Sequence, residues 1–274
     1  MELSMMTFML EFPVVFFKPG TKEEKLKEIE SFVELTAKTG YKKIDMIWQT
    51  IQLAGKEEIK RMLDANGLQL NCIIYMNVAG DDSSTPDVVD ACEFFGCKKI
   101  MLVPGTPTED REELFNLMVT NYTKAVNLAA EKGIVCVFED DPNIKVPCGT
   151  TEELEKVLNA VPGLKVVYDS ANMLPFGEEV VPYYEHFAAQ TAHVHVKDMQ
   201  ISETEPAGYS NPGTDGRFYI NAPHGTGAVD FDALFDALKK SGYNDTLAIE
   251  FVPMEGMDLA EDMKRVYDMF ISRI

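Results

Sequence analysis

Short, nearly continuous apolar runs alternate with longer amphipathic segments along the whole chain. Runs rich in Val, Ile and aromatic residues are typical of buried strands. They lie at 4–10, 42–48, 68–76, 98–105, 134–139, 164–169, 191–197 and 246–252. The amphipathic segments predict helices from Thr21 to Gly40, near 56–66, near 86–95, over about 110–132, from Thr150, near 178–189, near 230–241, and from about Asp258.

Two of these helices begin with a recognisable capping signal. Thr21 is followed by Glu24, and Thr150 is followed by Glu153. A Thr with a Glu three residues later predicts a capping box, in which each side chain bonds the other residue's backbone N–H.

Eight strand–helix pairs predict a single closed (β/α)8 barrel, the TIM-barrel fold, as one domain over residues 1–274. The alternative is an open doubly wound sheet, which usually carries a glycine-rich phosphate-binding turn after an early strand. The GTG sequence at 225–227 lies far downstream and follows no strand. The pattern therefore favours the barrel.

One connection is unusually long. Residues 199–229, between the seventh strand and its helix, are rich in Pro and Gly. Long connections in compact domains are usually functional or disordered. Because this one leaves the carboxyl ends of the strands, we interpret it as a substrate lid, with a contact between copies of a homo-oligomer as the alternative.

Four strands end in residues that commonly bind metals, namely Glu139, Asp169, His195 and Glu250. The carboxyl ends of barrel strands point into one pocket, so these side chains are expected to meet there. Three adjacent carboxylates repel unless a cation balances them. Oxygen ligands with one imidazole favour Mn²⁺, with Mg²⁺, Co²⁺ or Zn²⁺ as alternatives.

The amino-acid composition limits the classes of molecule that this protein is expected to bind. The chain has 45 acidic and 25 basic residues and a net charge of −20, which disfavours nucleic acid and anionic membranes. The five cysteines show no CxxC spacing, and the apolar N-terminus has no basic leader. No apolar run is long enough to span a bilayer. We therefore expect reduced thiols and a cytoplasmic location.

The strand-end residues belong to longer motifs. These are FED at 138–140, YDSAN at 168–172, HVHVKD at 193–198, and GTGAVDF followed by LAIE within 225–250. Together and in this order they resemble the xylose isomerase-like barrel superfamily, also called the sugar phosphate isomerase/epimerase superfamily. The HVHVKD form is most similar to its branch of inosose dehydratases and isomerases.

The resemblance implies one divalent metal bound by Glu139, Asp169, His195 and Glu250, with the two glutamates also acting as acid and base. The implied function is a metal-dependent isomerase or epimerase of a sugar, a sugar phosphate or a related polyhydroxy ketone, through a metal-bound enediolate. A dehydratase of a keto-cyclitol using the same residues, and a non-catalytic sugar-binding barrel, are the alternatives.

Three positions, in two of the motifs, depart from the ketose 3-epimerases of this superfamily. Asn172 stands where they commonly have histidine, and Lys197 with Asp198 stands where they have a GE sequence and an arginine. Lys197 is predicted as a catalytic acid or electrophile, with a supporting salt bridge as the alternative.

Substrate contacts are predicted for Asn172, Arg217, His224 and Trp48. The alternatives are a turn cap for Asn172, a solvated side chain for Arg217 and core packing for Trp48. His193 is expected to be a buried structural residue beneath the site, and His186 a surface residue.

Overall fold

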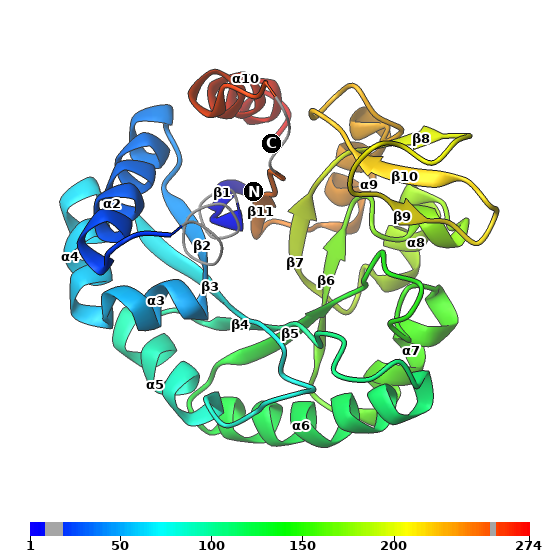
Figure 1. Ribbon diagram of the computed structural model, residues 1–274, viewed down its shortest axis with the longest axis horizontal. Helices are drawn as coiled ribbons and strands as arrows, with labels where there is room; N and C mark the ends of the chain where they lie inside the picture. Colours follow the sequence, from blue (N-terminus) through cyan, green and yellow to red (C-terminus); the bar gives the residue numbers. More distant parts are fainter. Residues whose placement is uncertain (9–18, 253–255) are drawn as a thin grey trace.

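The computed structural model describes residues 1–8, 19–252 and 256–274. In these residues eight parallel strands close into a barrel in the order β1-β11-β7-β6-β5-β4-β3-β2 (Figure 1). They are β1 (Glu2–Met6), β2 (Lys43–Ile47), β3 (Gln69–Tyr75), β4 (Lys99–Leu102), β5 (Val135–Glu139), β6 (Lys165–Asp169), β7 (Thr191–Val196) and β11 (Thr246–Ile249). The predicted (β/α)8 barrel is confirmed.

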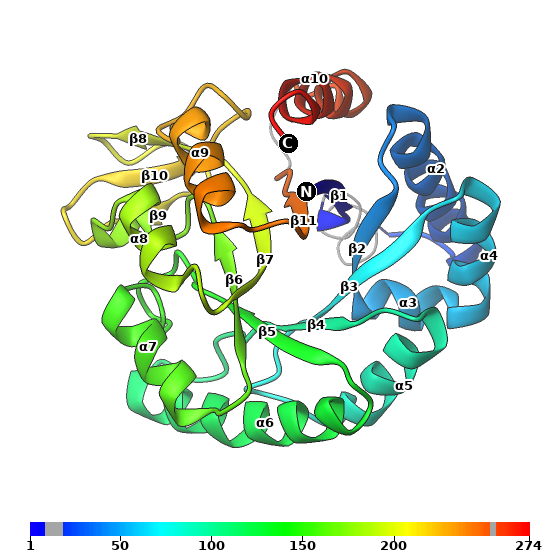
Figure 2. The same ribbon diagram turned by 180° about the vertical axis from the view of Figure 1, so that it is seen from behind.

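Helices form a ring outside the strands, as Figure 2 shows from behind. They are α2 (Lys22–Thr39), α3 (Trp48–Ala54), α4 (Lys56–Asn66), α5 (Thr85–Phe95), α6 (Arg111–Glu131), α7 (Thr151–Ala160), α8 (Val180–Phe187), α9 (Phe231–Ser241) and α10 (Leu259–Ile271), with a short 3₁₀ turn, η2 (Leu174–Phe176). None of the described helices is long and apolar enough to cross a bilayer.

The start of α3 corrects one predicted boundary. The second apolar run was assigned to a strand through Trp48, but β2 stops at Ile47 and Trp48 is the first residue of a helix. Gly55, with φ of 94°, then separates α3 from α4. An aromatic residue at the end of an apolar run is compatible with either element, so the run alone did not fix the boundary.

The two predicted capping boxes have different outcomes. At Thr21 both reciprocal bonds with Glu24 are present. At Thr150 the hydroxyl accepts the N–H of Glu153, but the Glu153 carboxylate accepts from Gly149 N–H and from Arg111. The second box is therefore only half formed, because an arginine and a neighbouring N–H compete for the same carboxylate.

Part of the barrel interior beneath the strand ends is an apolar cluster. The cluster comprises Met6, Ile47, Cys72, Ile74, Met101, Val137 and Val167, all buried. Val137 lies two residues before Glu139, so the layer under that carboxylate is apolar. Val135 lies at the opposite end of the strand and is partly exposed.

The 199–229 connection contains a small antiparallel sheet, β8 (Met199–Ser202), β9 (Asn211–Pro212) and β10 (Phe218–Asn221), in the order β8-β10-β9. The N–H of Thr214 donates to the carbonyl of Pro175, in η2, which ties the sheet to the barrel. Figure 1 shows the sheet beside the carboxyl ends of β6 and β7.

A buried carboxylate fixes both ends of this sheet. Asp198 accepts the backbone N–H of Met199 at the start of β8, and those of Gly225, Gly227 and Val229 after β10. A Cβ on Gly227 would lie 2.2 Å from Asp198 Oδ1, so only glycine allows this approach. The glycines of the GTG sequence at 225–227 thus allow the backbone to approach Asp198, a role that their position in the sequence did not reveal.

Candidate metal centre

Four neighbouring strands bring the predicted ligands together. Glu139 ends β5, Asp169 ends β6, His195 is in β7, and Glu250 follows β11. Asp169 and His195 are direct partners in the β6–β7 register. One ligand atom from each of the four residues lies within 4.8 Å of all the others.

The geometry of these atoms suits a divalent ion. His195 Nδ1 lies 2.5 Å from Glu139 Oε1 and 3.7 Å from Glu250 Oε2. Asp169 Oδ2 and His195 Nε2 are buried and have no hydrogen-bond partner among the described residues, and the buried atoms His195 Nδ1 and Glu139 Oε1 have none beyond these close contacts. Buried polar atoms almost always have a partner, so this donor set fits a cation.

Asp169 is held in a defined orientation. Its Oδ1 accepts the N–H groups of Ala171 and Asn172, both at 2.8 Å. These two bonds fix the carboxylate plane and leave Oδ2 directed toward the other ligands. The turn after β6 therefore presents one oxygen of Asp169 for coordination.

Burial and mutual repulsion shift the protonation of these groups. Burial, and then the charge of Asp169, raise the pKa of Glu139 well above its usual value, although Lys197 opposes the shift. Burial also raises the pKa of Glu250 to about 7, against Lys197. Burial lowers the pKa of His195, which favours the neutral, ligating imidazole.

Lys197 is the cation that the described chain brings to this cluster. Its Nζ lies 3.3 Å from Glu250 Oε1, 3.6 Å from Asp169 Oδ2 and 2.6 Å from Asn172 Oδ1. Burial lowers the pKa of Lys197, but the charges of Asp169 and Glu250 outweigh it and the net shift is upward. The ammonium group therefore stays protonated.

Asn172 connects two strand ends. Its Nδ2 donates to the backbone carbonyl of Asp140, and its Oδ1 accepts from Lys197. It is buried, and its own N–H is bound to Asp169. Asn172 thus orients Lys197 within the cluster.

A hydrogen-bonded network lies beneath the centre. His193 Nε2 is 2.6 Å from Asp45 Oδ2, while Asp45 Oδ1 accepts from Ser4 and Asn71. The His193 ring meets that of His195 edge-on, with centroids 5.0 Å apart. His193 is buried, as predicted. Asp45, Cys72 and His193 form a second group of residues of types that bind metals. The carboxylate of Asp45 is already bonded to Ser4, Asn71 and His193, so this group is explained by hydrogen bonding.

Asp140 is a buried acid whose environment the sequence did not predict. It is 1% exposed, and neither carboxylate oxygen has a hydrogen-bond partner among the described residues. Burial, and then the charge of Asp169, raise its pKa well above the usual range. Its position directly after Glu139 was the only signal in the sequence.

The other predicted substrate residues lie outside the ligand cluster. Trp48 is buried in the apolar layer between strands and helices. Arg217 bonds Asp215 within the small sheet. His224 is buried, bonds the carbonyl of Val196 and packs against Phe251 and other aromatic rings. Substrate contacts by these three residues stay predictions.

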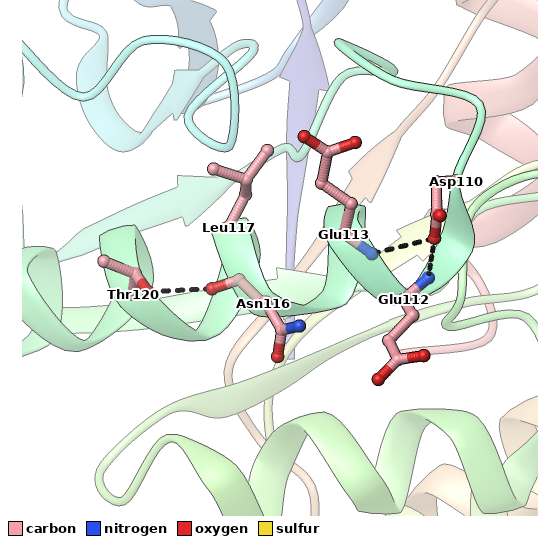
Figure 3. Close-up of a pocket in the computed structure, with 6 residues that line it drawn as sticks. All are labelled: Asp110, Glu112, Glu113, Asn116, Leu117 and Thr120. Atoms are coloured by element: carbon pink, nitrogen blue, oxygen red, sulfur yellow. Dashed lines mark hydrogen bonds between the residues drawn. The ribbon is translucent and has the colours of Figure 1, made fainter.

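A pocket of about 390 Å³ lies on the outside of the barrel, at the start of α6. Figure 3 shows its lining, which includes Asp110, Glu112 and Glu113. Asp110 caps the helix by accepting the N–H groups of Glu112 and Glu113. Helix capping and the helix dipole account for the acidic residues that line this pocket. The cluster of Glu139, Asp169, His195 and Glu250 lies elsewhere, at the strand ends, and we take that cluster as the candidate functional site.

Known proteins support the architecture. A Clostridium botulinum inosose dehydratase is 27% identical over 146 residues, 51% of this chain and 47% of that protein. The chain thus spans about half the length of the curated relatives it matches. Among solved structures, the IOLI protein with a binding zinc atom has a TM-score of 0.72 at 17% identity, covering 100% of this chain and 98% of its own.

A D-allulose 3-epimerase from Methylomonas sp. has a TM-score of 0.73 at 16% identity, again covering 100% of this chain and 98% of its own. At such identities the structural likeness concerns the fold. The sequence itself matches one family description across residues 33–270, from α2 to α10, and this range contains all four clustered strand ends. The chain therefore belongs to the xylose isomerase-like TIM barrel family.

Proposed function

We propose that this protein is a divalent-metal-dependent isomerase or epimerase of a sugar, a sugar phosphate or a related polyhydroxy ketone. The observation that carries the proposal is a pair of glutamates, the partly buried Glu139 and the buried Glu250, next to one imidazole nitrogen of His195. A solved structure of similar fold is a D-allulose 3-epimerase, which is consistent with this reaction class.

Glu139, Asp169, His195 and Glu250 would hold the metal, with Mn²⁺ as the first choice. When bound, the ion supplies Lewis-acid stabilisation of the negative charge that develops on a carbonyl oxygen. Glu139 and Glu250 come from β5 and the end of β11, on either side of β6 and β7. Two carboxylates so separated suit opposite faces of one substrate.

The proton transfers follow from that arrangement. One glutamate takes the proton from the carbon next to the carbonyl, and the other returns a proton from the opposite face, which inverts the centre. Return to the neighbouring carbon by the same glutamate gives isomerisation instead. The Lys197 ammonium donates to a substrate oxygen.

The second candidate is a dehydratase of a keto-cyclitol. It is favoured by the inosose dehydratase relative and by the position of Lys197, whose ammonium lies beside Glu250 and Asp169, where a donor to a departing hydroxyl is needed. The same glutamates would remove the first proton. The products distinguish the two reactions, since a dehydratase releases water and leaves an unsaturated ketone.

Proton NMR in D₂O tests the proposal. The Mn²⁺-loaded protein is incubated with a panel of ketoses, ketose phosphates and keto-cyclitols, and the ion is removed before spectra are recorded. We expect loss of a C–H signal next to a carbonyl, slowed roughly 100-fold or more in Glu139→Gln and Glu250→Gln. Glu155→Gln, at an exposed glutamate, is the control. Full exchange in both site variants would contradict the two-glutamate mechanism.

A further inference from the structure

The ring of His195 has no hydrogen bond that fixes its orientation within the described part of the chain. Its Nδ1 lies 2.5 Å from Glu139 Oε1 and 3.7 Å from Glu250 Oε2, so this nitrogen faces the other proposed ligands. The other nitrogen, Nε2, is buried and has no partner among the described residues. In most metal sites the second ring nitrogen donates to a carboxylate or a carbonyl, which fixes the ring. Here the described residues orient the ring by packing instead.

The ring of His193 is packed against that of His195. The two residues are two positions apart in β7, so their side chains project from the same face of the strand. The ring centroids are 5.0 Å apart and the ring planes lie at 83°, which is an edge-on contact. Both side chains are fully buried. A fixed His193 ring therefore limits the rotation of the His195 ring.

Hydrogen bonds hold His193 at both of its ring nitrogens. Nε2 is 2.6 Å from Asp45 Oδ2, and Nδ1 is 3.4 Å from Thr246 Oγ1. Asp45 is held in turn, because its Oδ1 accepts from Ser4 and Asn71. These residues come from β1, β2, β3, β7 and β11, so the bonds cross the interior of the barrel. The His193 ring thus has a rigid support on several strands.

A polar network at this depth is not needed to fill the barrel. Strands β4 and β5 fill the interior with apolar side chains such as Met101 and Val137. Replacing buried polar or charged groups by apolar groups of similar volume is often neutral or stabilising. The network passes through the residue that packs on His195, and this contact gives the network a role in the metal centre.

We propose that His193 is a positioning residue for the metal. Its ring, held by Asp45 and Thr246, sets the orientation in which the His195 imidazole meets the ion. This inference rests on the proposed function, because it requires His195 to bind a divalent metal. It goes beyond a structural role for His193, because it predicts an effect on metal affinity in the folded protein.

Calorimetric titration of the full-length, EDTA-treated protein with Mn²⁺ tests this inference. His193→Gln keeps a donor for Asp45 but removes the ring, and Thr246→Val removes one hydrogen bond of the ring. We expect the Kd for Mn²⁺ to rise roughly 10–100-fold in His193→Gln, and by a smaller factor in Thr246→Val. His186→Ala, at an exposed histidine, is the control and should bind as the wild type does. Circular dichroism and urea unfolding in EDTA identify the folded variants and their stability.

The outcomes separate this inference from the proposed function. If the folded variants bind Mn²⁺ as tightly as the wild type, the positioning role is overturned and the metal-dependent function stands. A lower stability with an unchanged Kd has the same meaning, because it assigns His193 to stability alone. If the wild type itself does not bind Mn²⁺, the proposed function fails and this inference fails with it. If His193→Gln does not fold, Thr246→Val decides by the same comparison.

Discussion

Lys197 shows how one residue can link stability and chemistry in this site. Its ammonium lies among Asp169, Glu250 and Asn172, and it is nearly fully buried. A positive charge beside the ligands also opposes a bound cation. We therefore predict that Lys197 stabilises the metal-free cluster and lowers its affinity for metal.

Replacement of Lys197 by Met should separate these effects. The metal-free variant should lose about 3 kcal/mol of unfolding free energy, because buried carboxylates lose their cation. Mn²⁺ should bind at least as tightly as in the wild type, while exchange slows roughly 100-fold. Urea unfolding in EDTA, calorimetric titration and D₂O exchange measure the three quantities. Weaker metal binding with normal exchange would refute this role; Lys145→Met, at an exposed lysine, is the control.

At the scale of elements, the 199–229 connection depends on the approach of Gly227 to Asp198. Gly227→Ala should destabilise the protein by roughly 1–3 kcal/mol, because the new Cβ overlaps a carboxylate and a backbone carbonyl that cannot both move away. Thermal unfolding measures the loss. Thr226→Ala, at the exposed neighbour, should have little effect. Equal stability of the two variants would show that the hydrogen bonds from Asp198 to the backbone of this connection are not needed for stability.

The barrel strands were predictable from short, nearly continuous apolar runs, because they are buried on both sides. The outer helices other than α3 were predictable from apolar residues at helical spacing, because each buries one face. The β8-β10-β9 sheet was missed because its strands are short and lie among Pro and Gly. The pairing of Asp198 with Gly225 and Gly227 was also missed, because it joins residues 27 and 29 positions apart.

The candidate site was predictable only in part, for a related reason. Strand ends converge in a parallel barrel, so Glu139 and its partners could be grouped from position alone. The burial of Asp140, the inward reach of Lys197 and the aromatic packing of His224 depend on contacts between distant segments. No local pattern encodes those contacts.

At the scale of the whole molecule, the four proposed ligands join β5, β6, β7 and β11, half of the closed barrel. A ligand that binds only the folded chain stabilises it by about 2.7 kcal/mol at 100 times its Kd. Removal of metal with EDTA should therefore lower Tm, and added Mn²⁺ should restore it in proportion to the logarithm of its concentration. Glu250→Gln should weaken this response, because one ligand loses its charge, whereas Glu155→Gln should retain it. A Tm that is independent of Mn²⁺ over a wide range of concentrations would argue that these four side chains do not form a metal centre, and that the buried carboxylates are stabilised by protonation and Lys197 alone.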